Sequence, residues 1–164
     1  MELPFFSGEY ELTIDPKNRL LIPAKVRSSL DGTSLIITVK GSVPWIYPCG
    51  FYKYLLSMQI TPTLNPNEPL QRYKRLTGAS TVELEWDNQG RVVLPSSILG
   101  RVELGKEVTL VGSIDHLELW SREKWIEDRD QLVAESDEIE DWALKTLPQL
   151  EPVKKPESGE SGKA

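Results

Sequence analysis

The chain has 164 residues, a formal net charge of −6, 39% hydrophobic residues and 27% charged residues. This composition supports a folded core and excludes a wholly disordered chain. One cysteine and one histidine exclude a disulfide framework, a multi-cysteine metal site and a pair of histidine ligands. No apolar run has membrane length, and Met1–Pro4 lacks the features of a secretory signal. We therefore expect a soluble cytoplasmic protein without a membrane partner.

Charge is distributed unevenly along the chain. Residues 1–78 carry nine basic and six acidic side chains, residues 79–127 carry five and nine, and residues 128–164 carry five and ten. Only the N-terminal part can therefore supply a positive field toward a polyanion, although the whole chain is acidic.

One sequence pattern occurs twice. The segment Glu11–Pro23 reappears as Glu83–Pro95 at an offset of 72 residues, with Glu, Leu, Asp, Arg and Pro in matching places. After one inserted residue the match continues, and Leu35–Val39 corresponds to Val108–Gly112. Such a duplication predicts two copies of one structural unit.

In chain order, each copy predicts a strand, a tight polar loop, a second strand that ends at proline, a helical turn and two further strands. The predicted strands are Tyr10–Ile14, Leu20–Ile22, Leu35–Val39, Trp45–Tyr47, Val82–Trp86, Val92–Leu94, Val108–Val111 and His116–Trp120. The predicted helical segments are Ala24–Ser29, Phe51–Gln59, Leu70–Leu76, Ser96–Leu99 and 121–147, the last interrupted near Ser136.

These elements predict four parts of the chain. They are a first repeat at 7–53, a linker and helix at 54–78, a second repeat at 79–125 and an acidic tail at 126–164. From about residue 150 the tail has too few large apolar side chains to offset its ordering entropy, so we expect it to be disordered.

Both copies carry the motif Asp-x-x-x-Arg between two strands, as Asp15–Arg19 and Asp87–Arg91. An aspartate at the start of a turn accepts hydrogen bonds from the backbone N–H groups that follow it. Asn18 and Gly90 occupy the same place, and both residue types tolerate a positive φ. We therefore expect four residues to shape the loops: Asp15, Asn18, Asp87 and Gly90. Each arginine either folds back onto its aspartate as a structural pair or points outward, and the duplication favours a functional role.

The chain resembles the MraZ family of bacterial transcriptional regulators of the division and cell-wall gene cluster. The matching residues, within about 5–130, are 8–11, 13–24, 82–84, 87–95, 108–112, 117–120 and Trp125. The resemblance implies an α+β, mainly β fold in which two AbrB-like swapped-hairpin repeats form a pseudo-dimeric double-split β-barrel with flanking helices. It also implies a homo-oligomeric ring, associated with the nucleoid, that binds direct repeats in promoter DNA through the Asp-x-x-x-Arg loops.

Carried onto this sequence, the resemblance implies that Arg19 and Arg91 contact double-stranded DNA, together with Lys17. An arginine fork matches the O6 and N7 atoms of guanine, or a phosphate. Four cations within one short stretch of the first repeat predict a phosphate footprint: Lys17, Arg19, Lys25 and Arg27.

The second repeat is poorer in cations. The places of Lys17, Lys25 and Arg27 are taken there by Gln89, Ser97 and Leu99. We therefore expect the first repeat to face DNA and Arg91 to be an auxiliary contact.

Two other classes of function compete with this hypothesis. The acidic composition favours a protein-interaction module on the same scaffold, which holds a partner as an antitoxin does and has reduced or no DNA binding. An enzyme is the weakest alternative, because we find no catalytic set and expect no metal, cofactor or small-molecule substrate. We expect His116 to be a surface or turn residue and Cys49 to be a bystander at a helix start.

Overall fold

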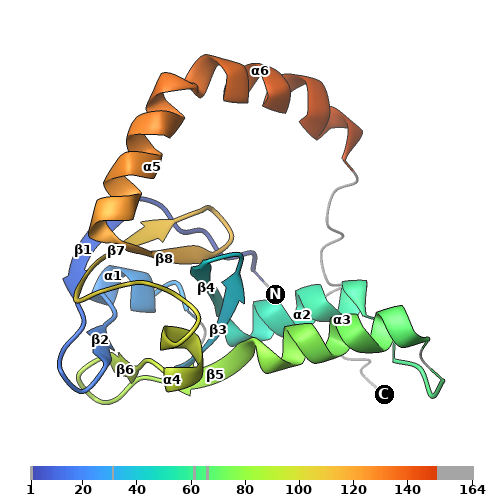
Figure 1. Cartoon of the computed structure of the whole chain (residues 1–164), viewed down its shortest axis with the longest axis horizontal. Helices are drawn as coiled ribbons and strands as arrows, with labels where there is room; N and C mark the ends of the chain where they lie inside the picture. Colours follow the sequence, from blue (N-terminus) through green and yellow to red (C-terminus); the bar gives the residue numbers. More distant parts are fainter. Residues whose placement is uncertain (1, 31, 61, 66, 151–164) are drawn as a thin grey trace, which may run out of the picture. The chain divides into compact units, whose positions relative to one another are not determined.

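The computed structural model describes residues 2–30, 32–60, 62–65 and 67–150. Figure 1 shows its elements along the chain. The strands are β1 (Glu9–Thr13), β2 (Arg19–Leu21), β3 (Ser34–Lys40), β4 (Val43–Pro48), β5 (Thr81–Glu85), β6 (Arg91–Val93), β7 (Glu107–Gly112) and β8 (Leu117–Ser121). The helices are α1 (Ala24–Arg27), α2 (Cys49–Gln59), α3 (Glu68–Ala79), α4 (Ser96–Leu99), α5 (Arg122–Ala134), α6 (Ser136–Thr146) and the 3-10 turn η1 (Leu147–Gln149).

The strands form two antiparallel sheets. The larger sheet has six strands in the order β1-β7-β8-β4-β3-β5, and the smaller one pairs β2 with β6. Helices and antiparallel sheets together confirm the predicted α+β class. The strand order runs from β1 at one edge to β5 at the other, and closure into a double-split barrel stays a prediction.

The two repeats exchange their first strands. In the pairing of β1 with β7, Glu11 lies opposite Thr109, and in the pairing of β5 with β3, Glu83 lies opposite Ile36. These two pairs occupy equivalent positions in the repeated sequence. Each repeat therefore completes the sheet of the other, and Leu3–Arg122 form one compact unit.

The core lies between the small sheet, the short helices and the inner face of the large sheet. Strands β2 and β6 contribute Leu20 and Val92, and helices α1 and α4 contribute Val26 and Ile98, all of them buried. Fully burying one such aliphatic side chain stabilises a fold by about 1.5–3 kcal/mol. The ribbon of β2 and β6 is consequently held by its inner face.

Helix α3 is longer than the predicted Leu70–Leu76. The side chain of Asn67 accepts a hydrogen bond from the backbone N–H of Leu70 at 2.9 Å and caps the helix at its start. The cap starts α3 at Glu68, ahead of the predicted start at Leu70.

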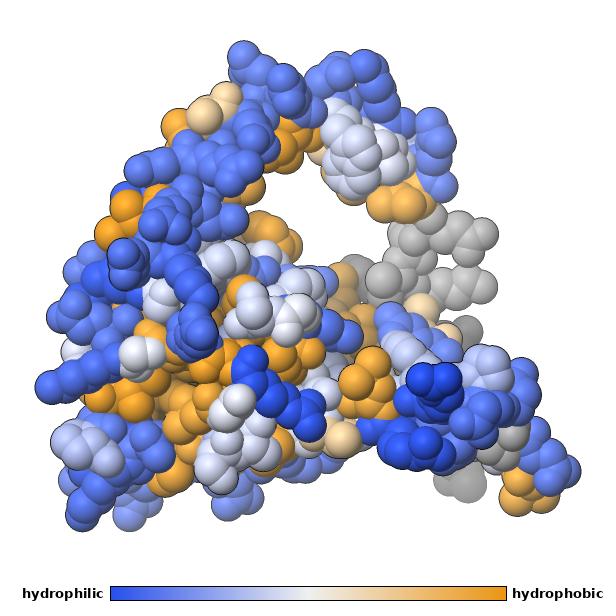
Figure 2. Space-filling model, viewed as in Figure 1, coloured by the Kyte–Doolittle hydropathy of each residue, from blue (hydrophilic) through white to orange (hydrophobic). Residues whose placement is uncertain are grey.

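A second unit contains the described residues from Glu123 to Leu150. Helix α5 ends at Ala134 and α6 begins at Ser136, which confirms the predicted interruption. Figure 2 shows mainly hydrophilic side chains along these helices, with apolar ones among them. The predicted disorder after residue 150 falls outside the described residues. Within the described part of the chain, no helix combines the length and apolar character needed to cross a membrane.

Candidate nucleic-acid interface

The first loop is organised by one carboxylate. Asp15 Oδ1 accepts hydrogen bonds from the backbone N–H groups of Lys17 and Arg19, both at 2.9 Å. Asp15 Oδ2 accepts a hydrogen bond from Arg19 Nε at 2.6 Å. Asn18 adopts a φ of 58°, as the tight turn requires. The loop therefore presents the Arg19 side chain in one defined position.

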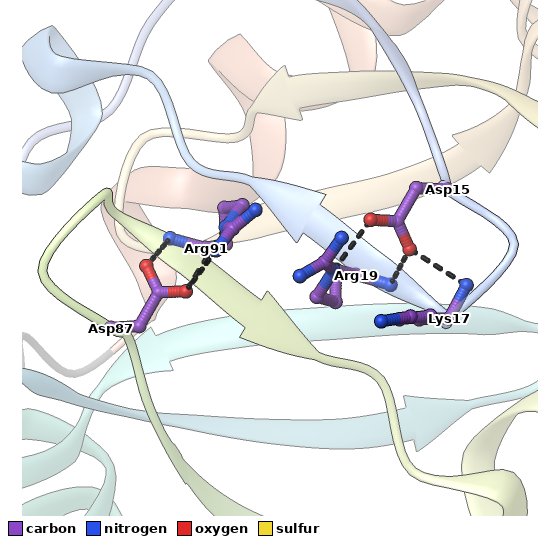
Figure 3. A network of polar contacts seen from close by, with 5 residues as sticks. All are labelled: Asp15, Lys17, Arg19, Asp87 and Arg91. Carbon is purple, nitrogen blue, oxygen red and sulfur yellow. Dashed lines mark hydrogen bonds and ion pairs between the residues drawn. The ribbon is translucent and has the colours of Figure 1, made fainter.

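The second loop repeats this geometry (Figure 3). Asp87 Oδ1 accepts from the backbone N–H groups of Gln89 at 2.8 Å and Arg91 at 3.0 Å, and Oδ2 accepts from Arg91 Nε at 3.0 Å. Gly90 adopts a φ of 81° at the place of Asn18. Both arginines thus fold back onto their aspartates.

The pKa values of the two aspartates follow from these contacts. Desolvation by burial would raise the pKa of Asp15, but hydrogen bonds from Arg19 and Lys17 outweigh it and lower that pKa. The backbone hydrogen bond from Arg91, with further hydrogen bonds from the same loop, lowers the pKa of Asp87. Both groups are carboxylates at neutral pH, so both ion pairs are formed there.

The ion pairs do not remove the arginines from the surface. About 30% of the Arg19 side chain and 29% of the Arg91 side chain stay exposed. An arginine has five N–H donors. Arg19 uses Nε toward Asp15, and Arg91 uses Nε and Nη2 toward Asp87, so other N–H groups of both side chains are not engaged by the aspartates. A structural pair and an outward contact are therefore compatible in this loop.

The outer face of the β2–β6 ribbon brings both arginines together. Arg19 lies opposite Val93 and Leu21 lies opposite Arg91, so the two arginines are diagonal neighbours across the ribbon. Leu21 is 51% exposed and Val93 is 58% exposed, whereas Leu20 between the outward residues is fully buried. This face therefore combines two guanidinium groups with two exposed aliphatic side chains.

The structure separates the remaining predicted cations. Lys17 is exposed in the first loop. Lys25 lines a pocket with Phe5 and Tyr10, and no residue of either Asp-x-x-x-Arg motif lines that pocket. Arg27 lies against Gly90 of the second loop, although the sequence places it in the first repeat. The four cations predicted as one footprint are thus divided among different contacts.

His116 lies in the bend before β8, which agrees with the expected turn, but the expectation that it lies at the surface is wrong. His116 is only 7% exposed, and its ring stacks on Trp45 at a centroid distance of 4.0 Å. Nδ1 lies 2.6 Å from Asp115 Oδ1 and Nε2 lies 3.2 Å from Glu118 Oε1. Burial would lower the pKa of His116, but hydrogen bonds and charge from the two carboxylates outweigh it and raise the pKa to about 8. The acidic residues around this single histidine were the available sequence signal.

Cys49 starts α2, as expected, and is buried. Its thiol lies 3.2 Å from Glu83 Oε1, and Lys53 Nζ lies 3.2 Å from Glu83 Oε2. Glu83, an acidic residue of the second repeat, is therefore paired with a cation. Among the described residues, no group of three or more His, Cys, Asp or Glu side chains is arranged to hold a metal ion.

Fold and site together define a class of protein: a duplicated α+β chain whose repeats exchange strands and present paired Asp–Arg loops on a common ribbon. The model of the MraZ protein family, which carries the description "antitoxin-like", matches residues 5–60 and 76–145. The chain belongs to the MraZ family.

Named relatives agree with this assignment. The transcriptional regulator MraZ of Neisseria meningitidis serogroup C is 36% identical over 124 residues, which cover 73% of this chain and 82% of the relative. The transcriptional regulator MraZ of Clostridium acetobutylicum is 31% identical over 129 residues, which cover 78% and 89%. Family membership makes the chain a transcriptional regulator and not an enzyme, as the sequence predicts.

Proposed function

We propose that this chain binds double-stranded promoter DNA with the outer face of the β2–β6 ribbon and its two loops. The observation that carries the proposal is the diagonal placement of Arg19 and Arg91 on one two-stranded antiparallel ribbon. The major groove of B-DNA admits such a ribbon, and an arginine fork pairs with O6 and N7 of guanine. The exposed aliphatic residues Leu21 and Val93 suit contact with thymine methyl groups.

The aspartates support this role by orienting the arginines. Asp15 and Asp87 hold the Nε edge of each guanidinium, so less conformational entropy is lost when DNA binds. Lys17 adds an exposed cation that suits a phosphate. We assign Lys25 no base contact, because it lines the pocket beside Phe5.

Assembly into a homo-oligomeric ring is part of the proposal. Several copies of a modest cationic patch gain affinity together when the spacing of DNA repeats matches the spacing of subunits. This reasoning supports direct repeats as targets, and the resemblance to the MraZ family supports promoters of division and cell-wall genes. Binding to promoter DNA in turn implies a cytoplasmic, nucleoid-associated location.

Selection of bound duplexes from a random DNA pool tests the proposal. We expect the selected duplexes to share a repeated short sequence and their affinity to fall steeply with salt. Arg19→Ala should abolish this binding without changing the subunit number measured by light scattering. Arg75→Ala, which removes the same charge from exposed α3, is the matched control and should bind as the unmodified protein does.

A protein-interaction module is the second candidate function. The net charge of −6 and the exposed apolar side chains of the acidic helix α6, with Trp142 58% and Leu144 78% exposed, favour it. Absent or salt-independent DNA binding, together with stoichiometric capture of one protein partner, would support this alternative and contradict DNA recognition.

A further inference from the structure

Arg27 is placed on the loop of the opposite repeat. A Cβ atom built on Gly90 would lie 2.6 Å from Arg27 Cζ and 2.7 Å from Arg27 Nε, so the guanidinium occupies the space beside this glycine. Arg27 Nε also donates a hydrogen bond to the Ile22 carbonyl at 3.0 Å. The N–H of Ile22 donates in turn to the Gly90 carbonyl at 2.9 Å. Ile22, a residue of the first repeat, thus forms hydrogen bonds with both Arg27 and Gly90 of the second loop.

The equivalent place at the first loop is built differently. There Leu99 replaces Arg27 and is partly buried against the core, and Asn18 replaces Gly90. Asn18 is exposed, whereas Gly90 is buried. A positive φ does not by itself demand glycine in this turn, because Asn18 adopts a φ of 58° in the same place. Contact with Arg27 therefore explains the glycine.

The position of Arg27 gives both loops the same number of cations. The first loop carries its extra cation, Lys17, within the motif, and the second loop has Gln89 in that place. Arg27 supplies the missing cation from the other repeat. Among the described residues, Arg27 pairs with no carboxylate, so its charge is not neutralised by an ion pair. Each loop then has one aspartate and two cations: Asp15, Lys17 and Arg19 in the first, and Asp87, Arg91 and Arg27 in the second.

We propose that Arg27 is a phosphate-binding residue of the second loop, contributed across the strand exchange, and that both loops engage DNA with equal charge. This inference rests on the proposed function and revises the expectation that the second repeat only assists. Its ligand is a phosphate group of a DNA duplex, which the planar donor fork of arginine binds in a bidentate manner. Arg91 then contacts DNA in the same way as Arg19, and is not an auxiliary contact.

Three variants test the placement: Arg27→Ala, Gly90→Asn and the double variant. Asparagine keeps the turn, as Asn18 shows, but its Cβ displaces the Arg27 guanidinium, which is the far end of a flexible side chain. The probe is the duplex that the unmodified protein selects from a random pool, titrated by fluorescence anisotropy across a range of salt. Arg75→Ala, which removes an arginine from exposed α3 outside both loops, is the matched control.

We expect each single variant to make the slope of log K against log salt less negative by about 0.9, the value for one lost phosphate contact. The double variant should match the single ones, because both changes remove the same contact. Arg75→Ala should leave the slope unchanged. Circular dichroism melts of all variants check that the fold is retained.

The results that would overturn the inference are distinct from failure of the proposed function. If Arg27→Ala keeps the slope of the unmodified protein, or if Gly90→Asn keeps it while Arg27→Ala changes it, Arg27 does not act at the second loop. A double variant with the summed loss also overturns the placement. If the unmodified protein selects no duplex, the proposed function fails, and this inference fails with it.

Discussion

Trp45 lies directly opposite Glu118 in the pairing of β4 with β8. These residues hold the same position in the two repeats once the single insertion is counted, so an internal two-fold axis passes between them. The same relation exchanges Arg19 and Arg91 on the ribbon. The two arginines are therefore equivalent by topology, and each depends on strands from both repeats for its position.

Lys17 should contribute one phosphate contact. Replacing it with alanine is expected to make the salt slope of DNA binding less negative by about one, and to weaken binding similarly for all sequences. Gln89→Lys places a cation at the equivalent site of the second loop and should change the slope in the opposite direction. Anisotropy titrations from low to high salt measure both. An unaltered slope in the alanine variant would show that Lys17 does not contact DNA.

The variant Asp15→Asn distinguishes the role of Asp15 in shaping the loop from its role in the ion pair with Arg19. The amide oxygen can still accept the loop N–H groups, but the charge that holds Arg19 is lost. We expect a slightly lower thermal midpoint at neutral pH, because the ion pair with Arg19 is lost, and a smaller affinity difference between the selected duplex and a scrambled one. Because the pKa of Asp15 is lowered, its stabilising effect is present above the ordinary aspartate pKa and is lost only as pH falls through the lower folded value. Equal discrimination by variant and unmodified protein would contradict this role.

His116 should make stability depend on pH. Its pKa of about 8 in the fold exceeds the ordinary 6.5, so its contribution is fully present below pH 6.5 and is lost as pH rises through 8. The groups that face the ring are Asp115, Glu118, Trp45 and Tyr47. The free energy of unfolding in urea should fall by up to about 2 kcal/mol over this range. His116→Gln should flatten the profile, and a profile that keeps its slope in this variant would assign the effect to another group.

Leu20 and Leu21 are neighbours in β2 with opposite environments. Leu20 is fully buried and Leu21 is 51% exposed on the outer face. Leu20→Ala should cost about 2–5 kcal/mol of unfolding free energy, because it leaves a cavity in the core. Leu21→Ala should change stability by less than about 0.5 kcal/mol. Chemical denaturation compares the pair, and equal losses would mean that the ribbon does not pack as described.

Local features of the sequence were enough to predict most strands and both loops. The alternation of apolar residues, the prolines after β2 and β6 and the aspartate at each turn all act within a few residues. The cap at Asn67 is also local, and its omission explains why the start of α3 was predicted later than Glu68. The exchange of strands between repeats was predicted from the family resemblance and not from the pattern of residues.

Contacts between distant segments could not be predicted in this way. His116 is buried because β4 brings Trp45 and Tyr47 against it, a pairing that no local pattern encodes. Arg27 belongs to the first repeat in the chain and to the second loop in space. The duplication and the basic residues are visible in the sequence itself. The turns could be predicted from it because short-range sterics and hydrogen bonding produce them. Which cation serves which loop follows from antiparallel pairing across the repeats, because that pairing sets neighbours irrespective of their separation along the chain.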